Sequence, residues 1–198
     1  TLEDNKQANL VSGTNIKTIG GTSVLGSGDL EVAGGSMVLL GTVTASASAT
    51  VDFDGLYTAT YDEYVLVGTS VVSPIDVGSM YMVCKTAGVW DIGSNYQNPT
   101  VLNTAVASLT SKANIVQTIG NEVNEGTDFE IKIYNPLSTT QFKRYIATAI
   151  ASEYSGGTRS SISGISHRVA TADTGIRLII NAGTITSGTF KLYGIAKA

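Results

Sequence analysis

The chain has 198 residues, of which 42% are hydrophobic and 14% are charged, and its formal net charge is −4. This balance favours a folded or assembled protein, because disordered chains combine low hydrophobicity with high net charge. The pI of about 4.9 and the scattered basic residues argue against a nucleic-acid partner, which usually selects a clustered basic surface.

The cysteine count and the length of the apolar runs argue against a disulfide-stabilised secreted domain and against a membrane-spanning protein. The single cysteine, Cys84, permits no intrachain disulfide, and its place in the apolar run 80–84 predicts a buried, inert thiol. No apolar run approaches the roughly 20 residues that span a bilayer, so we expect no membrane insertion. The chain opens on Thr1 rather than Met, which is typical of an expressed fragment, a processed product or the end of a longer protein.

The first 35 residues are expected to form an attachment or trimerisation segment. Two short strand-like runs flank Gly20-Gly21 and predict a β-hairpin. A lone hairpin is marginally stable in water, so its apolar residues need a partner surface, either the main domain or other copies of the chain. Gly34-Gly35 marks the joint to a head domain over 36–198. The candidate assembly residues are Leu10, Val11, Ile16, Ile19, Val24 and Leu25.

From residue 37 onward, short β-like runs alternate with turn residues such as Asp54-Gly55, Asn135-Pro136 and Gly156-Gly157. Many short strands without intervening helices predict an all-β fold, an antiparallel β-sandwich or jelly roll. The run Thr100–Leu109 is compatible with either a helical turn or an edge strand. We predict strands over 37–44, 50–57, 64–72, 79–85, 113–118, 128–134, 143–152, 161–169, 175–181 and 188–195.

Three stretches resemble virion proteins of tailed bacteriophages. Residues 9–29, Asn-Leu-Val-Ser-Gly-Thr-Asn-Ile-Lys-Thr-Ile-Gly-Gly and onward to Asp29, are similar to an element that recurs in tail-fibre and related adhesin proteins, although Gly20 replaces the usual Asn. Residues 61–67 with Ser73-Pro74, and the ending over 183–195, resemble the β-sandwich domain that closes many phage fibre and decoration proteins. Together the stretches touch both ends and the middle of the chain.

This resemblance implies a tail-fibre, spike or head-fibre protein of the virion, working as a homotrimer. Its implied partners are other virion proteins and a host cell-surface glycan or protein. Trimerisation also agrees with the residues, since three copies of the N-terminal segment would share a core and give avidity to weak contacts.

Catalytic and metal-binding patterns are scarce in this sequence. Residues 164–168 are not a Gly-x-Ser-x-Gly nucleophile motif, because Arg168 stands where the last glycine belongs. One cysteine and one histidine cannot fill a tetrahedral metal site within one chain. We therefore expect no catalytic residue, no metal and no cofactor, and His167 as a solvent-facing or hydrogen-bonded strand residue. Three copies of His167 meeting on a trimer axis remain an alternative.

Asp52 and Asp54 lie two residues apart and so share one face if this segment is a strand. Such a pair is compatible with Ca²⁺ binding or with acid–base work in glycoside hydrolysis. The alternative, which the following Asp-Gly turn favours, is a solvated strand end.

Aromatic residues near amides and guanidinium groups are the candidates for glycan contact, because sugar faces stack on aromatic rings. Their alternative role, which we favour for Trp90 and Tyr96, is packing in the core or between subunits. The receptor-binding candidates are Trp90, Asn95, Tyr96, Gln97, Asn98, Tyr154 and Arg159.

The sequence thus leads to a non-catalytic phage structural protein with a receptor-binding head. The first alternative is a decoration or cementing protein of capsid or tail without receptor binding. A glycan depolymerase is a distant third, because those enzymes are usually far larger and present carboxylate pairs in a long groove.

Overall fold

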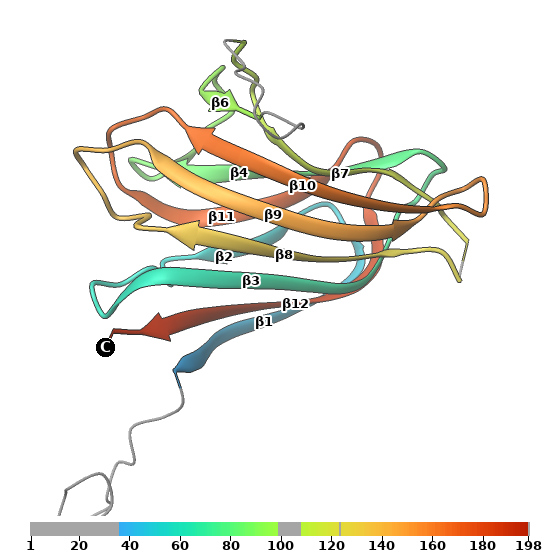
Figure 1. Cartoon of the computed structure of the whole chain (residues 1–198), viewed down its shortest axis with the longest axis horizontal. Coiled ribbons are helices and arrows are strands. Elements are labelled where there is room, and N and C mark those ends of the chain that lie inside the picture. Colours follow the sequence, from blue (N-terminus) through green and yellow to red (C-terminus); the bar gives the residue numbers. More distant parts are fainter. Residues whose placement is uncertain (1–35, 99–107, 123, 198) are drawn as a thin grey trace, which may run out of the picture. The chain divides into compact units, whose positions relative to one another are not determined.

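The computed structural model describes residues 36–98, 108–122 and 124–197, all of which belong to one compact unit, Ser36–Ala198. Two antiparallel sheets pack face to face as a β-sandwich (Figure 1). The larger sheet has the order β1 (Met37–Ser48), β12 (Ile185–Ala196), β3 (Tyr61–Val72), β8 (Thr127–Tyr134), β9 (Lys143–Ser152), β10 (Thr158–His167) and β6 (Tyr96–Gln97). The smaller has the order β2 (Val51–Asp54), β11 (Asp173–Ile180), β4 (Gly78–Thr86) and β5 (Val89–Trp90), with β7 (Ala113–Ile119) also on β4.

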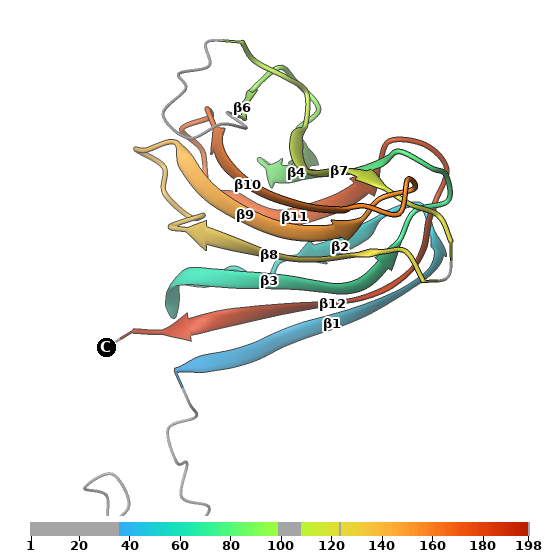
Figure 2. The same cartoon turned by 45° about the vertical axis from the view of Figure 1, so that its right-hand side comes forward.

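Strand order identifies the sandwich as a jelly roll. The sets β1-β12-β3-β8 and β2-β11-β4-β7 are two four-stranded sheets between which the chain passes repeatedly, as a jelly roll requires. The β9–β10 hairpin is an addition that extends the larger sheet. Figure 2 shows this side of the larger sheet curving toward β7, where Ser161 Oγ donates to the carbonyl of Ile115 at 3.3 Å.

The alternating pattern of the sequence builds the core between the sheets. In β9, every second side chain from Lys143 to Ala151 is buried and the others are exposed. β8 alternates in the same way and directs Phe129, Ile131 and Ile133 inward. Both patterns follow from the two-residue period of a strand with one face on a core.

The prediction of an all-β sandwich or jelly roll is confirmed, and each of the ten predicted strands corresponds to an observed one. Sequence analysis missed β5 and β6, because two residues are too few to show an alternation. The predicted hairpin, its assembly residues and most of the run 100–109 lie outside the described residues. Within the described ranges, no helix is long and apolar enough to cross a membrane.

Candidate functional site

Trp90 lies half-buried on the outer face of the smaller sheet, between two cationic side chains. β5 pairs with β4 so that Trp90 stands opposite Lys85, whose Nζ lies 5.7 Å from the ring centroid. The guanidinium carbon of Arg177, on β11, lies 4.3 Å from the same centroid. Both distances allow cation–π attraction, so the two cations hold the ring in place against the sheet.

Asp52 and Asp54 share this face, as their spacing predicted, and each has its own cation. The Nε and Nη2 atoms of Arg177 donate to the two oxygens of Asp52 at 2.7 Å and 2.6 Å. Lys85 Nζ lies 2.5 Å from Asp54 Oδ2. Because Arg177 and Lys85 already neutralise the two carboxylates, the arrangement argues against a Ca²⁺ site and against an acid–base pair. Asp52, Asp54, Lys85, Trp90 and Arg177 are called the Trp90 group below.

Tyr96 is a core residue, which corrects its assignment to a receptor-contact surface. Its side chain is fully buried and its ring stacks on His167 at a centroid distance of 4.8 Å. The hydroxyl accepts a hydrogen bond from the backbone nitrogen of Cys84 at 2.8 Å and donates to the carbonyl of Asp91 at 2.9 Å. A ring enclosed in this way has no free face for a sugar, so the packing alternative holds for Tyr96.

The amides beside Tyr96 connect chain segments to one another. Asn95 Nδ2 donates to both carboxylate oxygens of Asp91, at 3.0 Å and 2.9 Å, and Gln97 Oε1 accepts from Arg168 Nη1 at 2.8 Å. Asn98 Oδ1 accepts from the backbone nitrogen of Asn114. These bonds fix the short strand β6 against β10 and β7, and they occupy the groups that were expected to meet a ligand.

Tyr154 and Arg159 lie in and beside the β9–β10 turn, far from the other candidates. Tyr154 is 53% exposed, and Arg159 Nε donates to Glu153 Oε1. Hydrogen bonds from Thr118 and Arg159 lower the pKa of Glu153. Arg159 lies eight positions before His167 on β10, a span of about 26 Å in an extended strand, and His167 is the residue that stacks on Tyr96. The structure therefore does not gather the predicted receptor residues into one site.

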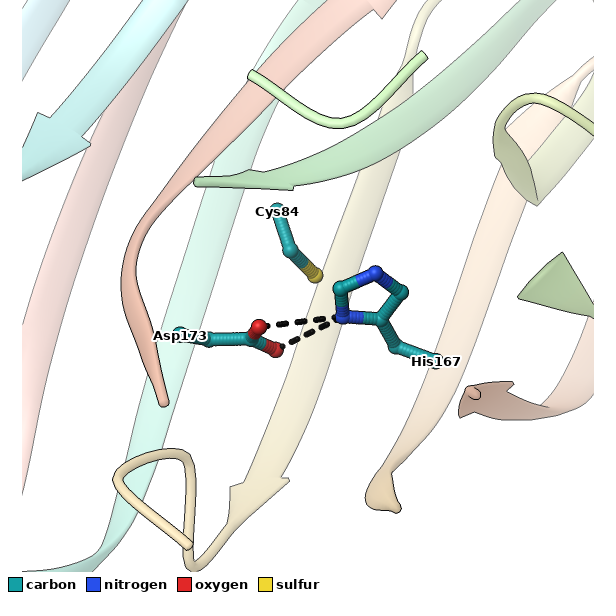
Figure 3. A group of neighbouring side chains, drawn as sticks. All are labelled: Cys84, His167 and Asp173. Atoms are coloured by element: carbon teal, nitrogen blue, oxygen red, sulfur yellow. Dashed lines mark hydrogen bonds and ion pairs between the residues drawn. The ribbon is translucent and has the colours of Figure 1, made fainter. Parts of the chain in front are cut away.

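A buried ionic network that sequence analysis missed lies between the sheets, with Asp173 at its centre. Thr86 Oγ1 donates to Asp173 Oδ1 at 2.8 Å, and Tyr145 OH donates to Oδ2 at 2.5 Å. His167 Nδ1 lies 3.0 Å and 3.1 Å from the two oxygens (Figure 3). The members of this Asp173 network are Thr86, Asp91, Lys143, Tyr145, His167 and Asp173.

His167 is bonded to a carboxylate through each ring nitrogen, because Nε2 lies 2.7 Å from Asp91 Oδ2. Burial by itself lowers the pKa of His167, but hydrogen bonds and charge from Asp173 and Asp91 outweigh it, and the pKa lies above its ordinary value. Burial alone raises the pKa of Asp91, but bonds from His167 and Asn95 bring it below its usual value. The ring is therefore best described as an imidazolium that donates both N–H groups.

Lys143 supplies the second cation of the network. Its side chain is fully buried, and Nζ lies 3.7 Å from Asp173 Oδ1. Nζ also donates to the carbonyl oxygens of Val169 and Thr171. Two cations, Lys143 and His167, thus face two carboxylates, Asp173 and Asp91. A buried charge needs such pairing and hydrogen bonding to be tolerated.

Cys84, His167 and Asp173 have the composition of a nucleophile, a base and an orienting acid, but not the required geometry. A base needs an unprotonated nitrogen directed at the nucleophile, and both nitrogens of His167 are bonded to carboxylates. The thiol instead lies 3.1 Å from Tyr145 OH, and burial raises the pKa of Cys84. The thiol is therefore not activated, and its predicted burial is confirmed.

The same three residues bring their ligand atoms within 4.8 Å of one another, a grouping that counting cysteines and histidines did not anticipate. A metal requires a deprotonated thiol and a neutral imidazole. Here both ring nitrogens of His167 already face carboxylate oxygens, and Lys143 Nζ lies 3.7 Å from Asp173 Oδ1. The donor set fits an ion-pair network better than a metal ion. Three copies of His167 cannot meet on a trimer axis, because the ring is fully buried within its own chain.

The burial of Lys143 could have been predicted from the sequence. Lys143 is in phase with Tyr145, Ala147, Ala149 and Ala151, so the two-residue period of β9 already directs its charged side chain inward. Nothing comparable marks Asp91, which lies in a loop, or links it to residues more than 70 positions later.

Comparison with protein-family models finds no family that matches this chain. A search of the curated proteins likewise finds none that matches it.

Proposed function

We propose that this chain is a non-catalytic virion protein of a tailed bacteriophage, a homotrimeric tail-fibre, spike or head-fibre subunit whose jelly-roll head contacts the host surface. The observation that carries the proposal is the run of residues 9–29, which resembles a recurring tail-fibre element, ahead of a jelly-roll unit. Jelly rolls are common in viral capsid and lectin domains, which is support by analogy of fold.

The chemistry of the described residues supports a structural rather than a catalytic role. Cys84 and His167 do not form a nucleophile–base pair. The carboxylates of Asp52 and Asp54 are each paired with a basic side chain. Catalysis by paired carboxylates needs one group free to accept a proton and one free to donate it. The Trp90 group and the Asp173 network provide neither.

Host contact is assigned to the two aromatic candidates that are not enclosed in the core, the half-buried Trp90 and the exposed Tyr154. Trp90 lies among carboxylates and cations that can hydrogen-bond to sugar hydroxyls, and Tyr154 stands beside Arg159 on an exposed turn. Single contacts of this kind are weak, and a trimer would present each of them three times.

A glycan array probed with the 198-residue chain tests this proposal. We expect binding to one class of bacterial surface glycan, loss of binding in Trp90→Ala or Tyr154→Ala, and unchanged binding in Tyr81→Ala, a matched aromatic change elsewhere on the smaller sheet. Incubation with the bound glycan should release no new reducing ends. Turnover of the glycan would overturn the non-catalytic role, and absence of binding to both glycans and host cells would overturn receptor binding.

The exposed isoleucines of the larger sheet favour a second candidate function, a decoration or cementing protein. Ile146, Ile150 and Ile162 offer an apolar surface that capsid or tail proteins could cover. This candidate predicts binding to virion particles that lack the chain, without any binding to host cells or glycans.

A further inference from the structure

The two outer faces of the sandwich differ in how they meet solvent. The outer face of a sheet is the one turned away from the other sheet. Among strands of at least seven residues, all the strongly exposed large apolar side chains lie on the outer face of the larger sheet. The outer face of the smaller sheet instead carries the paired charges of the Trp90 group. The apolar residues are Met37, Leu39, Ile146, Ile150 and Ile162, with exposed fractions between 41% and 55%.

Three of these side chains are neighbours on adjacent strands. Ile146 stands opposite Gly164, and Ile162 stands opposite Thr148, so Ile162 lies diagonally between Ile146 and Ile150. Diagonal neighbours on one face of an antiparallel pair are within reach of large side chains. Gly164 adds no side chain beside Ile146, and Thr148 lies between the two isoleucines of β9. Contiguous exposed apolar surface of this kind marks an interaction site.

The second part of the apolar surface lies at the other side of the sheet. Met37 stands opposite Ile195, and Leu39 opposite Tyr193. A hollow of about 390 Å³ opens here, and its lining combines apolar side chains (Met37, Val65 and Ile195) with charged ones (Glu63, Glu130 and Lys132). The hollow has room for a side chain of a partner. On the other half of the face, the isoleucines of β9 and β10 protrude into solvent.

Charge on the outer face is balanced and interleaved. The acidic groups are Glu63, Asp128 and Glu130, and the basic groups are Lys132, Arg144 and Lys191. Arg168, one residue beyond β10, adds a fourth basic group beside Gln97, so the face is nearly neutral. The whole chain has a net charge of −4, so two copies repel each other overall but least across this face. The same balance offers nothing to an anionic membrane or to nucleic acid, which need a basic surface.

The free edge of β1 adjoins this face. Among the described residues, β1 pairs with β12 alone. Its twelve residues, Met-Val-Leu-Leu-Gly-Thr-Val-Thr-Ala-Ser-Ala-Ser, hold no charge and no proline, the usual devices that protect an edge strand from pairing with another chain. The irregularity between Leu39 and Gly41 is the one such device that β1 carries, and the rest of the edge is open to pairing with another chain.

We infer that the outer face of the larger sheet is the surface through which copies of this chain associate, with three such faces enclosing a shared apolar core around the trimer axis. The inference rests on the proposed homotrimer and names the surface that builds it. The isoleucines of β9 and β10 on one copy pack against the β1–β12 side of the next, a head-to-tail contact that closes into a ring. Interleaved acidic and basic groups around the apolar residues fix the register.

Light scattering of the 198-residue chain tests the surface. We expect the mass of a trimer, and we expect Ile146→Glu with Ile162→Glu to raise the dissociation constant at least about a hundredfold, because buried charges are left without partners. The matched control is Val89→Glu with Ile92→Glu, which changes two exposed apolar residues outside this face and should leave the trimer intact. Thermal unfolding of both variants checks that the chain still folds.

Thiol labelling tests whether this face is covered even if the double-glutamate variant remains a trimer through other contacts. Cys84 is fully buried, so a cysteine introduced at Thr148, at the centre of the isoleucine patch, is the reactive thiol. We expect Thr148→Cys in the trimer to be labelled at least about tenfold more slowly than Val89→Cys, each relative to its rate in denaturant. Equal rates in a trimer would overturn this surface while leaving the trimeric function standing. A wild-type monomer at every concentration would overturn both.

Discussion

Nδ1 of His167, the last residue of β10, lies 3.0 Å from Oδ1 and 3.1 Å from Oδ2 of Asp173, the first residue of β11. The contact joins the larger sheet to the smaller one across the core. Because both side chains are fully buried, the pair is exposed to little solvent screening, and its loss should be measurable in stability and in pH dependence.

Replacing Asp173 by Asn should destabilise the fold by roughly 3–5 kcal/mol, because the buried cations Lys143 and His167 lose their shared carboxylate. Urea unfolding of the variant measures this loss. The control is Asp54→Asn, which breaks the partly exposed pair with Lys85 and should cost less than about 1 kcal/mol. Equal small losses in both variants would show that the network contributes no more than a surface ion pair.

Stability should fall as pH rises through the neutral range. The pKa of His167 is raised in the folded chain above its ordinary value of 6.5, so the protonated ring contributes stability that is complete below about 6.5 and is lost as pH rises through the folded pKa. The pKa of Asp91 is lowered, so its contribution is lost only in acid, as pH falls through a pKa below its usual value.

Thermal unfolding from about pH 5 to about pH 9 measures this dependence. His167→Gln removes the titrating group, so its melting temperature should be lower and should decline less between these limits. A variant with the same slope as the original chain would assign the pH dependence to other groups.

Cys84 should resist thiol reagents in the native protein. Its side chain is fully buried and its pKa is raised by burial, so little thiolate is present and access requires opening of the sandwich. We expect native labelling at least about a hundredfold slower than labelling in denaturant. Val89→Cys, on an exposed position, provides the accessible control. Rapid, complete labelling of the unmodified native chain would contradict the buried position.

Gly68→Ala should destabilise the sandwich by roughly 1–3 kcal/mol through overpacking. Gly68 stands opposite Phe129, and a Cβ at this position would lie 2.5 Å from two carbons of that ring. The control is Gly157→Ala, whose Cβ would come no closer than 3.4 Å to Glu153. The two melting temperatures give the comparison. A Gly68→Ala chain as stable as the control would show that the ring moves aside at little cost.

Local spacing along the chain was enough to predict the longer strands and, where the alternation is regular, their buried sides. Alternation over residues 143–152 and 128–134 predicts which side chains of β9 and of its neighbour β8 face the core, because a strand directs successive side chains to opposite faces. The same periodicity assigned Phe129 and Ile131 correctly to one side. These features depend on neighbours along the chain, so they can be read from local spacing.

The contacts between polar residues that lie far apart in the sequence depend on how the sheets pack. Asp91, Lys143, His167 and Asp173 lie on a loop and on strands of both sheets, and their contact depends on strand order and on the packing of one sheet on the other. Tyr96 shows the same limit: its amide-rich surroundings suggested a ligand site, whereas the pairing of β6 with the end of β10 buries its ring. Pairings between distant segments have no local period, so spacing along the chain cannot reveal them.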